Sequence, residues 1–355
     1  MKTALREEKQ TNVVITRDLE KHLAFPDVCL LNDGSLLVTY RDAIDHWNAP
    51  SRIMTTRCPN PMERLEFDPP QCICDTDLDD RDPSLTQLPD GTLLLSFVRY
   101  QKEKMGVVID SNTGEQLGYI PDAEQPPTPL ALVKSKDNGK SWGPPKDITL
   151  LDPPKELGNR LATTASMVVL PGGDLLMPIH NYRGSYVIRS KDGGESWGEV
   201  TPIAVAEAPI FEEPTITELQ DGRLLAFLRA DNRGEGYLYQ ALSADEGRTW
   251  TEPERLNLWG LPAHVLQLSD GRIVATYGYR RIPCGVRYCV ARPGPTWSVA
   301  DEYALRSDGH SFGDLGYPSS VELPDGSVFT VYYITEEFGL YPGLTYIAGT
   351  KYRPK

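Results

Sequence analysis

Acidic, basic and tyrosine side chains stand at fixed distances from a repeated turn in this sequence. A carboxylate beside a phenol can exchange a proton with it, and nearby arginines can bind an anionic ligand. Eight residues before each turn, the sequence has Phe25, Asp82, Thr164, Glu213, Pro262 and Tyr317. Seven residues after each turn glycine, it has Arg41, Val98, His180, Arg229, Gly278 and Tyr333. These residue types suit acid-base chemistry on a charged substrate.

The turn is an Asp-Gly pair, or once Gly-Gly, between two runs of apolar residues. Its six copies are Asp33-Gly34, Asp90-Gly91, Gly172-Gly173, Asp221-Gly222, Asp270-Gly271 and Asp325-Gly326. Glycine accepts a positive φ, so each copy predicts a β-hairpin. Because hairpin strands are antiparallel, the residues eight before and seven after lie together at the end opposite the turn. We therefore expect one mouth to gather Asp82, Glu213, Tyr317, Arg41, Arg229, Arg280 and His180.

A second repeated phrase falls between the hairpins, at residues 135–142, 190–197 and 243–250. Each copy has the pattern Ser-x-Asp-x-Gly-x-Ser/Thr-Trp, and a fourth copy that matches this pattern only in part ends at Trp297. The Asp carboxylate can accept backbone N–H bonds, the glycine can take the left-handed conformation, and the Trp can pack between sheets. We therefore assign these aspartates a structural role.

Two hairpins per repeat make a four-stranded sheet, and six such sheets bury both faces by stacking around an axis. The sequence predicts an all-β fold, a six-bladed β-propeller of four-stranded antiparallel blades, with residues 1–355 as one domain. We expect residues 12–16 to pair with residues 345–350 and close the ring. Residues 101–129 are polar and proline-rich and predict a long loop.

Composition limits the partners that this protein can have. The chain has 355 residues and a formal net charge of −14, which disfavours nucleic acid and anionic membranes. Its beginning has no apolar leader, and no run approaches about 18 apolar residues, so we expect neither secretion nor a membrane span. Six cysteines without paired spacing or a histidine nearby favour reduced thiols in a cytoplasmic protein and disfavour zinc.

Two of the hairpin phrases and the Asp-containing turns together resemble the sialidase (neuraminidase) superfamily. The phrases are residues 213–222, which lead to Arg229, and residues 316–326, which contain Tyr317. The resemblance covers nearly the whole chain. It implies a retaining exo-glycosidase without a cofactor, in which a tyrosine is the nucleophile, a glutamate draws its proton, and an aspartate is the general acid/base. A tyrosine nucleophile is physically reasonable here, because a neutral phenol is not repelled by the carboxylate that the substrate carries at its anomeric carbon.

The resemblance assigns roles to particular positions. Tyr317 matches the nucleophile and Glu213 its base; Asp45 matches the acid, with Asp42 as a rival. Arg229 and Arg280 match two of the three arginines that bind the sugar carboxylate, with Arg281 as a substitute for Arg280. The position of the first family arginine holds Ala24, which Arg41 or Arg52 would have to replace.

Three further residues are candidate substrate contacts. Asp82, in the phrase Arg81-Asp82-Pro83, resembles an aspartate that faces the funnel of sialidase-like hydrolases. His180 and His264 lack metal-ligand spacing, and each fits a packed side chain as well as a substrate contact.

The leading hypothesis is therefore an exo-acting hydrolase that releases a terminal acidic sugar from a carbohydrate substrate. Because Ala24 replaces the first family arginine, two other activities are alternatives. One is another exo-glycosidase, such as an arabinan-trimming enzyme, and the other is a lyase acting on uronic acids. A glycan-binding propeller without catalysis is the third interpretation.

Overall fold

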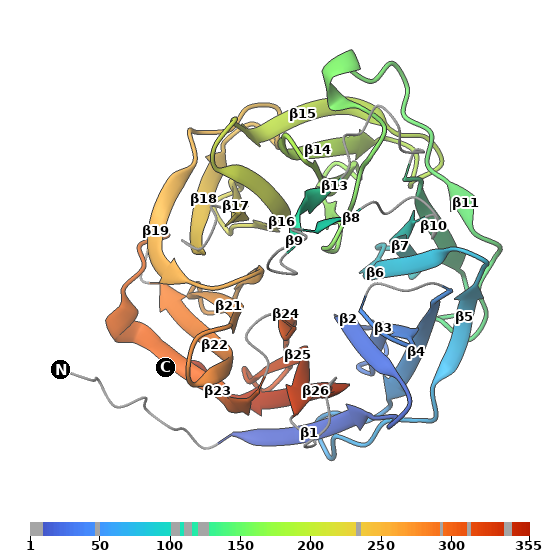
Figure 1. The fold of residues 1–355 in the computed structure, drawn as a ribbon, viewed down its shortest axis with the longest axis vertical. Coiled ribbons are helices and arrows are strands. Elements are labelled where there is room, and N and C mark those ends of the chain that lie inside the picture. The colour runs from blue at the N-terminus through green and yellow to red at the C-terminus, as the bar shows by residue number, and fades with distance from the viewer. Residues whose placement is uncertain are drawn as a thin grey trace.

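Short antiparallel sheets arranged around a central axis make up this protein (Figure 1). The computed structural model describes residues 10–46, 50–100, 107–109, 116–119, 128–231, 236–291, 294–310, 314–336 and 343–355. Strands dominate, and the helical elements of this described part are two 3₁₀ turns, η3 (Lys155–Leu157) and η4 (Val299–Asp301). The predicted all-β class is confirmed.

Four of the sheets have four strands each, built from consecutive hairpins. The first contains β6 (Asp79–Gln87), β7 (Leu93–Tyr100), β10 (Leu130–Ser135) and β11 (Lys146–Asp147). The second contains β12 (Val168–Val169), β13 (Leu175–Asn181), β14 (Gly184–Ser190) and β15 (Gly198–Val205). The third contains β16 (Ile210–Glu218), β17 (Leu224–Asp231), β18 (Tyr237–Ser243) and β19 (Glu254–Trp259). The fourth contains β20 (Ala263–Gln267), β21 (Ile273–Tyr279), β22 (Cys284–Ala291) and β23 (Glu302–Gly309).

An eight-stranded sheet completes the ring. One half contains β2 (His22–Leu30), β3 (Leu36–Ala43), β4 (Arg52–Cys58) and β5 (Gln71–Asp75). The other half contains β24 (Gly316–Glu322), β25 (Val328–Glu336), β26 (Leu344–Tyr352) and β1 (Thr11–Thr16). The two halves meet where His22 on β2 pairs in parallel with Thr345 on β26.

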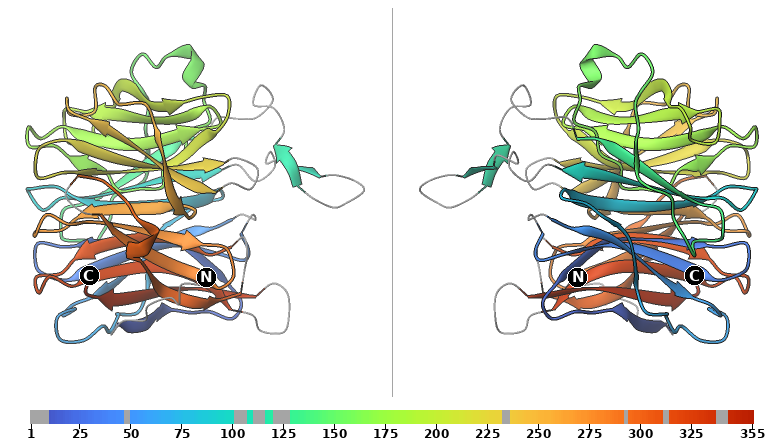
Figure 2. Two further views of the ribbon diagram at one scale, coloured as in Figure 1. Left: turned by 90° about the vertical axis from the view of Figure 1, so that its left-hand side faces the viewer. Right: turned by 90° about the vertical axis from the view of Figure 1, so that its right-hand side faces the viewer.

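The prediction of six separate four-stranded sheets therefore needs correction. Hydrogen bonding gives four four-stranded sheets, because the pairing of His22 with Thr345 fuses the first and last repeats into one eight-stranded sheet. The predicted ring closure is confirmed, since β1 runs antiparallel to β26 with Thr11 opposite Lys351. A separate two-stranded sheet, β8 (Val107–Ile109) with β9 (Gln116–Tyr119), projects from one face of the ring (Figure 2).

All six predicted hairpin turns form. In the first, the N–H of Gly34 donates to the carbonyl of Leu31, and Gly34 has a φ of 83°. The same bond and a positive φ recur at Gly91, Gly173, Gly222, Gly271 and Gly326. A side chain at these positions would be strained, which explains why glycine stands in every copy.

The Asp-containing turns also have the predicted structure. The Asp192 carboxylate accepts the N–H of Ser196 at 2.9 Å, while the Ser190 hydroxyl accepts the N–H of Gly194 at 2.8 Å. Trp197 is 2% exposed and packs with residues of both neighbouring sheets. These turns serve the packing of the ring, as predicted.

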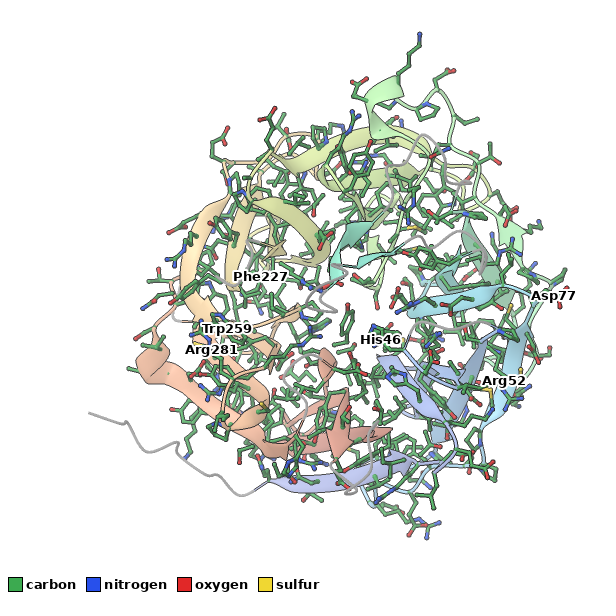
Figure 3. The ribbon with its side chains drawn as sticks, in the orientation of Figure 1. His46, Arg52, Asp77, Phe227, Trp259 and Arg281 are labelled. Atoms are coloured by element: carbon green, nitrogen blue, oxygen red, sulfur yellow. The ribbon has the colours of Figure 1, made fainter. Side chains whose placement is uncertain are left out.

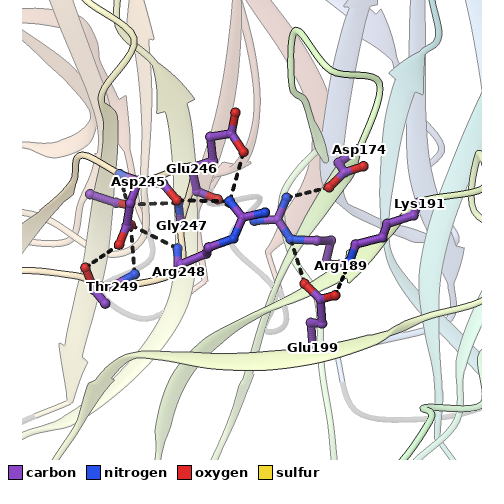
Figure 4. Close-up of polar contacts among 10 residues, drawn as sticks. Asp174, Arg189, Lys191, Glu199, Asp245, Glu246, Gly247, Arg248 and Thr249 are labelled. Atoms are coloured by element: carbon purple, nitrogen blue, oxygen red, sulfur yellow. Dashed lines mark hydrogen bonds and ion pairs between the residues drawn. The ribbon is translucent and has the colours of Figure 1, made fainter.

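An arginine joins one of these turns to the hairpin turn of the neighbouring sheet (Figure 4). Arg189 contacts the Asp174 carboxylate at 2.8 Å and the Glu199 carboxylate at 3.3 Å. The same guanidinium donates to the carbonyl of Glu246 at 2.5 Å, within the next Asp-containing turn. Adjacent sheets are therefore fastened at the face opposite the predicted mouth.

All six cysteines are free of disulfides in the described residues. Burial raises the pKa of Cys74 and Cys289 to about 12 each, so these two thiols stay protonated. The cytoplasmic location stays a prediction.

The described helices are all too short to cross a membrane.

Candidate active site

Four residues of the predicted mouth have a backbone conformation that is rare outside glycine. Phe25, Asp82, Glu213 and Tyr317 have φ values of 54°, 53°, 48° and 48°. Each lies at a shift in strand register, and each is followed by a proline. A bulge bends the strand and redirects its side chain, and such strained residues gather at functional sites. The same bulge in four strands of three sheets thus turns these four side chains toward one place.

The residues eight before each turn do meet, as the hairpin geometry predicts. All six line the narrow inner end of one pocket: Phe25, Asp82, Thr164, Glu213, Pro262 and Tyr317. His264, two residues after Pro262, lines the same end. The prediction that the ring brings these positions to one mouth is confirmed.

A wider cavity of about 360 Å³ continues from this inner end. This volume suits a small ligand such as one sugar unit. Six of the predicted site residues line it, namely Asp82, Glu213, Tyr317, Arg229, Arg280 and His180. Arg81, Arg160 and Glu212 line it too, so four arginines face three carboxylates in a protein whose net charge is −14. The cavity therefore concentrates positive charge that could bind an anionic group.

Glu213 is the centre of the hydrogen bonding in this cavity. Its Oε1 atom accepts a short hydrogen bond from the Tyr317 hydroxyl. Both of its carboxylate oxygens lie 2.9 Å from Nη1 of Arg229. Glu213 and the Arg229 side chain are 9% and 18% exposed, so water screens the pair only partly. A phenol thus donates a hydrogen bond to a carboxylate that an arginine holds in place.

The pKa values of this group move in opposite directions. Burial alone would raise the pKa of Glu213, but the charge of Arg229 and the Tyr317 hydrogen bond lower it below its ordinary value. Burial and the charge of Glu213 raise the pKa of Tyr317 well above the usual value for a phenol. Tyr317 is therefore neutral at rest, and Glu213 is ionised and able to accept its proton.

Asp82 differs from Glu213 in its surroundings. It is partly buried and follows Arg81 on β6. Burial is the largest influence and the Glu213 charge adds to it; together they outweigh the nearby arginines and raise the pKa of Asp82 to about 7. Two carboxylates whose pKa values are pushed apart in one pocket are the usual arrangement for separate acid and base roles.

Both predicted histidines reach the pocket. His180 lines the wide cavity, and its buried Nε2 atom has no hydrogen-bond partner among the described residues. Burial lowers the pKa of His180 to about 4, although the charge of Glu213 opposes the shift. Burial also lowers the pKa of His264 to about 4. Both imidazoles are thus neutral near pH 7 and can hydrogen-bond a ligand without adding charge.

The structure does not bring Arg41 or Asp45 to the pocket. Arg41 is fully buried; its Nε donates to Asp79 at 2.8 Å and its Nη1 to the carbonyl of Asp45 at 2.9 Å. The prediction of Arg41 as a substrate contact is wrong for this reason. Asp45 is not among the residues that line either part of the pocket, whereas its neighbour His46 is. Asp45 lies in the loop after β3, where hairpin spacing does not specify the direction of a side chain.

The other sequence alternatives also lie away from the pocket lining. Arg52 pairs with Asp42 at 2.9 Å, on the outer side of the ring (Figure 3). Arg281 stacks over the Trp259 ring, with its guanidinium carbon 4.2 Å from the ring centroid (Figure 3). Arg280, in contrast, lines the cavity and donates to the carbonyl of Leu315 at 3.1 Å.

The missing first arginine has a structural consequence. Ala24 is completely buried, and Phe25 fills the adjacent mouth position. The Arg81 guanidinium lies over the Phe25 ring at 4.8 Å and pairs with Asp79 at 3.5 Å. Arg81 thus supplies a positive charge to the cavity from the neighbouring sheet.

Sequence reasoning missed several polar residues of the cavity, among them Arg81, Tyr100, Arg160 and His46. Arg81 stands one residue before the counted position, and Tyr100 stands two residues after the counted Val98. Arg160 and His46 come from loops, where no repeat spacing applies. The first two could have been found by widening the counted window.

Comparison with known proteins agrees with this repeat architecture. The family model of the BNR repeat-like domain matches residues 80–330. The chain belongs to this family. A sialidase from Paraclostridium sordellii is 34% identical over 137 residues, which cover 34% of this chain and 32% of that protein. Sialidase-4 from Homo sapiens is 27% identical over 186 residues, which cover 42% of this chain and 36% of that protein. The match thus spans about a third of each relative's length, and the predicted resemblance to the sialidase superfamily is confirmed.

Solved structures share the fold over nearly the entire chain. A protein of unknown function from Dyadobacter fermentans DSM 18053 is 26% identical, with a TM-score of 0.80, covering 97% of this chain and 98% of that one. The intramolecular trans-sialidase from Ruminococcus gnavus is 14% identical, with a TM-score of 0.70 and 96% of each chain covered. The α-L-arabinanase from Penicillium chrysogenum is 15% identical, with a TM-score of 0.64, covering 96% of this chain and 97% of that one.

Proposed function

We propose that this protein is an exo-acting glycoside hydrolase that releases a terminal acidic sugar with retention of configuration. The observation that carries the proposal is the hydrogen bond from Tyr317 to Glu213 in a cavity with four arginines. Sialidase relatives support a glycosidase. The reaction takes place in one domain of six repeats. Four repeats are the four-stranded sheets, and the eight-stranded sheet contains the other two.

In the first step, the Tyr317 oxygen attacks the anomeric carbon while Glu213 takes the phenol proton. Arg229 keeps Glu213 ionised and oriented, since both carboxylate oxygens contact its Nη1 atom. A neutral phenol suits this attack because it avoids repulsion by an anionic substrate. The product is a glycosyl-tyrosine intermediate.

Asp82 protonates the departing oxygen in our proposal, in place of the predicted Asp45. Asp82 lines both parts of the pocket, and its raised pKa of about 7 keeps much of it protonated near neutrality. Once ionised, it can remove a proton from the water that cleaves the intermediate. Tyr317 then leaves and recovers its proton from Glu213.

The substrate's negative charge is inferred from the arginines. Arg81, Arg160 and Arg280 line the wide cavity together with Arg229. A planar carboxylate can accept two parallel N–H bonds from a guanidinium. His180 and His264 would contact neutral hydroxyl groups, because burial keeps them uncharged.

One observation favours a second candidate, an exo-glycosidase acting on a neutral sugar such as arabinose. Ala24 and Phe25 stand where the sialidase superfamily resemblance places its first arginine, so the arginine set is altered. The fold of an arabinanase also matches this chain, with a TM-score of 0.64. Two further alternatives are lyase activity on uronic acids and glycan binding without turnover.

A panel of aryl glycosides tests the proposal. Sialic acid, uronic acid and arabinose glycosides are assayed with the wild-type protein and with Glu213→Gln. Turnover of an acidic glycoside that Glu213→Gln lowers by roughly 10²–10⁴ supports the proposal. Turnover of arabinose glycosides alone favours the second candidate, and binding without turnover rejects hydrolysis.

A further inference from the structure

Two histidines and an aspartate meet beside the wide cavity, at the joint between the first and last repeats. Nε2 of His22 lies 2.8 Å from Oδ2 of Asp314, and Nδ1 of His46 lies 2.9 Å from Oδ1 of Asp314. The three ligating atoms lie within 4.8 Å of one another. Among the described residues, this is the one group of three or more histidine, cysteine or acidic side chains close enough to share an ion.

We propose that His22, His46 and Asp314 form a binding site for a divalent transition metal of the zinc class. Two imidazole nitrogens and one carboxylate oxygen are a common three-ligand set for such ions, with a position left open. The sequence expectation of no metal rested on spacing along the chain, whereas these ligands come from three distant segments.

An ion would draw the three ligand atoms together from their present separations, which are all within 4.8 Å. Zinc binds nitrogen and oxygen at about 2.0–2.2 Å, so two ligands of a tetrahedral ion lie about 3.3 Å apart. The contacts of Asp314 with both histidines are already 2.8 and 2.9 Å. The two rings are arranged edge to face, with centroids 5.3 Å apart, and each presents a nitrogen to the same carboxylate.

The cluster is only partly open to water. His22 is 7% exposed, and the side chains of His46 and Asp314 are 23% and 27% exposed, so an ion could reach the site from the side of His46. Metal binding at such a site contributes to the stability of the fold. Arg81 places an opposing charge near His46, but Asp79 pairs with that guanidinium at 3.5 Å.

The position in the fold suggests what the ion would do. His22 begins β2 of the first repeat, while Asp314 precedes β24 of the last repeat. His22 also forms the parallel pairing with Thr345 that joins these repeats. An ion bound here would crosslink the first and last repeats. It would also lie beside the cavity, because its ligand His46 lines that cavity (Figure 3).

Metal content and titration with zinc test the site in tag-free, reduced protein. We expect one Zn²⁺ per chain by plasma mass spectrometry, a rise in melting temperature on adding Zn²⁺, and Co²⁺ absorption bands typical of nitrogen and oxygen ligands. His46→Ala and Asp314→Asn should each weaken Zn²⁺ binding at least tenfold. The matched control is His310→Ala, which removes an exposed histidine outside the cluster.

Two results would overturn the proposal. The first is wild-type protein that binds no Zn²⁺ and shows no change in melting temperature. The second is binding that survives both cluster substitutions or is lost equally in His310→Ala. Circular dichroism confirms that each variant is folded, and His46→Ala keeps the test valid if Asp314→Asn fails to fold, since His46 is only partly buried. None of these readouts depends on glycosidase activity.

Discussion

The Tyr317 hydroxyl donates a hydrogen bond to Glu213, although the two residues are 104 positions apart in the sequence. Each sits in a bulge at the inner end of its strand, with a φ of 48°. The repeated geometry of the ring, and not local sequence, creates this contact. It joins the two groups that a tyrosine nucleophile needs, the phenol and the acceptor of its proton.

Replacing either partner of this contact should affect turnover more than binding. Tyr317→Phe and Glu213→Gln should each lower kcat by roughly 10²–10⁴, because proton removal occurs in the transition state. Affinity for a substrate analogue should stay within a few-fold of wild type. Steady-state kinetics and calorimetric titration measure the two quantities. A double variant much slower than either single variant would show that the residues act separately.

Asp82 should set the basic side of the pH profile. As the proton donor it must be protonated, so activity should fall as pH rises above about 7, the raised pKa of Asp82. Asp82→Asn should lose roughly 10²–10⁴ in kcat and also lose this basic limb. Rates with a good leaving group, which needs no proton, should suffer less. An unchanged basic limb in Asp82→Asn would remove Asp82 from the acid role.

The same raised pKa predicts an effect on stability. The folded protein holds the Asp82 proton more tightly than the unfolded chain does, so the contribution of Asp82 to stability is lost as pH rises from about 4 through about 7. Asp82→Asn should therefore melt about 2 °C or more above wild type at pH 8. The difference should vanish at pH 4. Thermal unfolding at both pH values measures it, and a lower melting temperature at pH 8 would contradict the proposed burial cost.

Arg229 should control the acidic side of the pH profile. Its charge lowers the pKa of Glu213, which acts as a base only when ionised. In Arg229→Ala the pKa of Glu213 should rise, so activity should be lost at higher pH on the acidic side than in wild type. A pH series of kcat measures the shift. No movement of the acidic limb would mean that Glu213 is not the group that titrates.

Arg41 and Arg52 provide a matched pair for stability. Arg41→Ala leaves the 1% exposed Asp79 without its closest arginine, which should cost about 3–5 kcal/mol of unfolding free energy. Arg52 is 40% exposed in its pair with Asp42, so Arg52→Ala should cost about 0–1 kcal/mol. Denaturant unfolding compares them. Equal costs would contradict the structural role of Arg41.

Repeat spacing predicted the parts of this structure that repeat. Counting eight residues back from each turn found Asp82, Glu213 and Tyr317, because antiparallel strands have a fixed length between turn and mouth. It failed for Arg41, because the side chain of this β3 residue is buried against Asp79 instead of lining the pocket. It could not reveal that His22 joins two repeats, because that pairing depends on how the ring closes.

Trapping the glycosyl-enzyme tests the central claim most directly. A fluorinated acidic sugar with a good leaving group is incubated with the protein, and the labelled peptide is sequenced by mass spectrometry. The proposed mechanism predicts one sugar on Tyr317, with no label in Tyr317→Phe and slower labelling in Glu213→Gln. Label on Asp82 or Glu213, or full turnover by Tyr317→Phe, would contradict the mechanism.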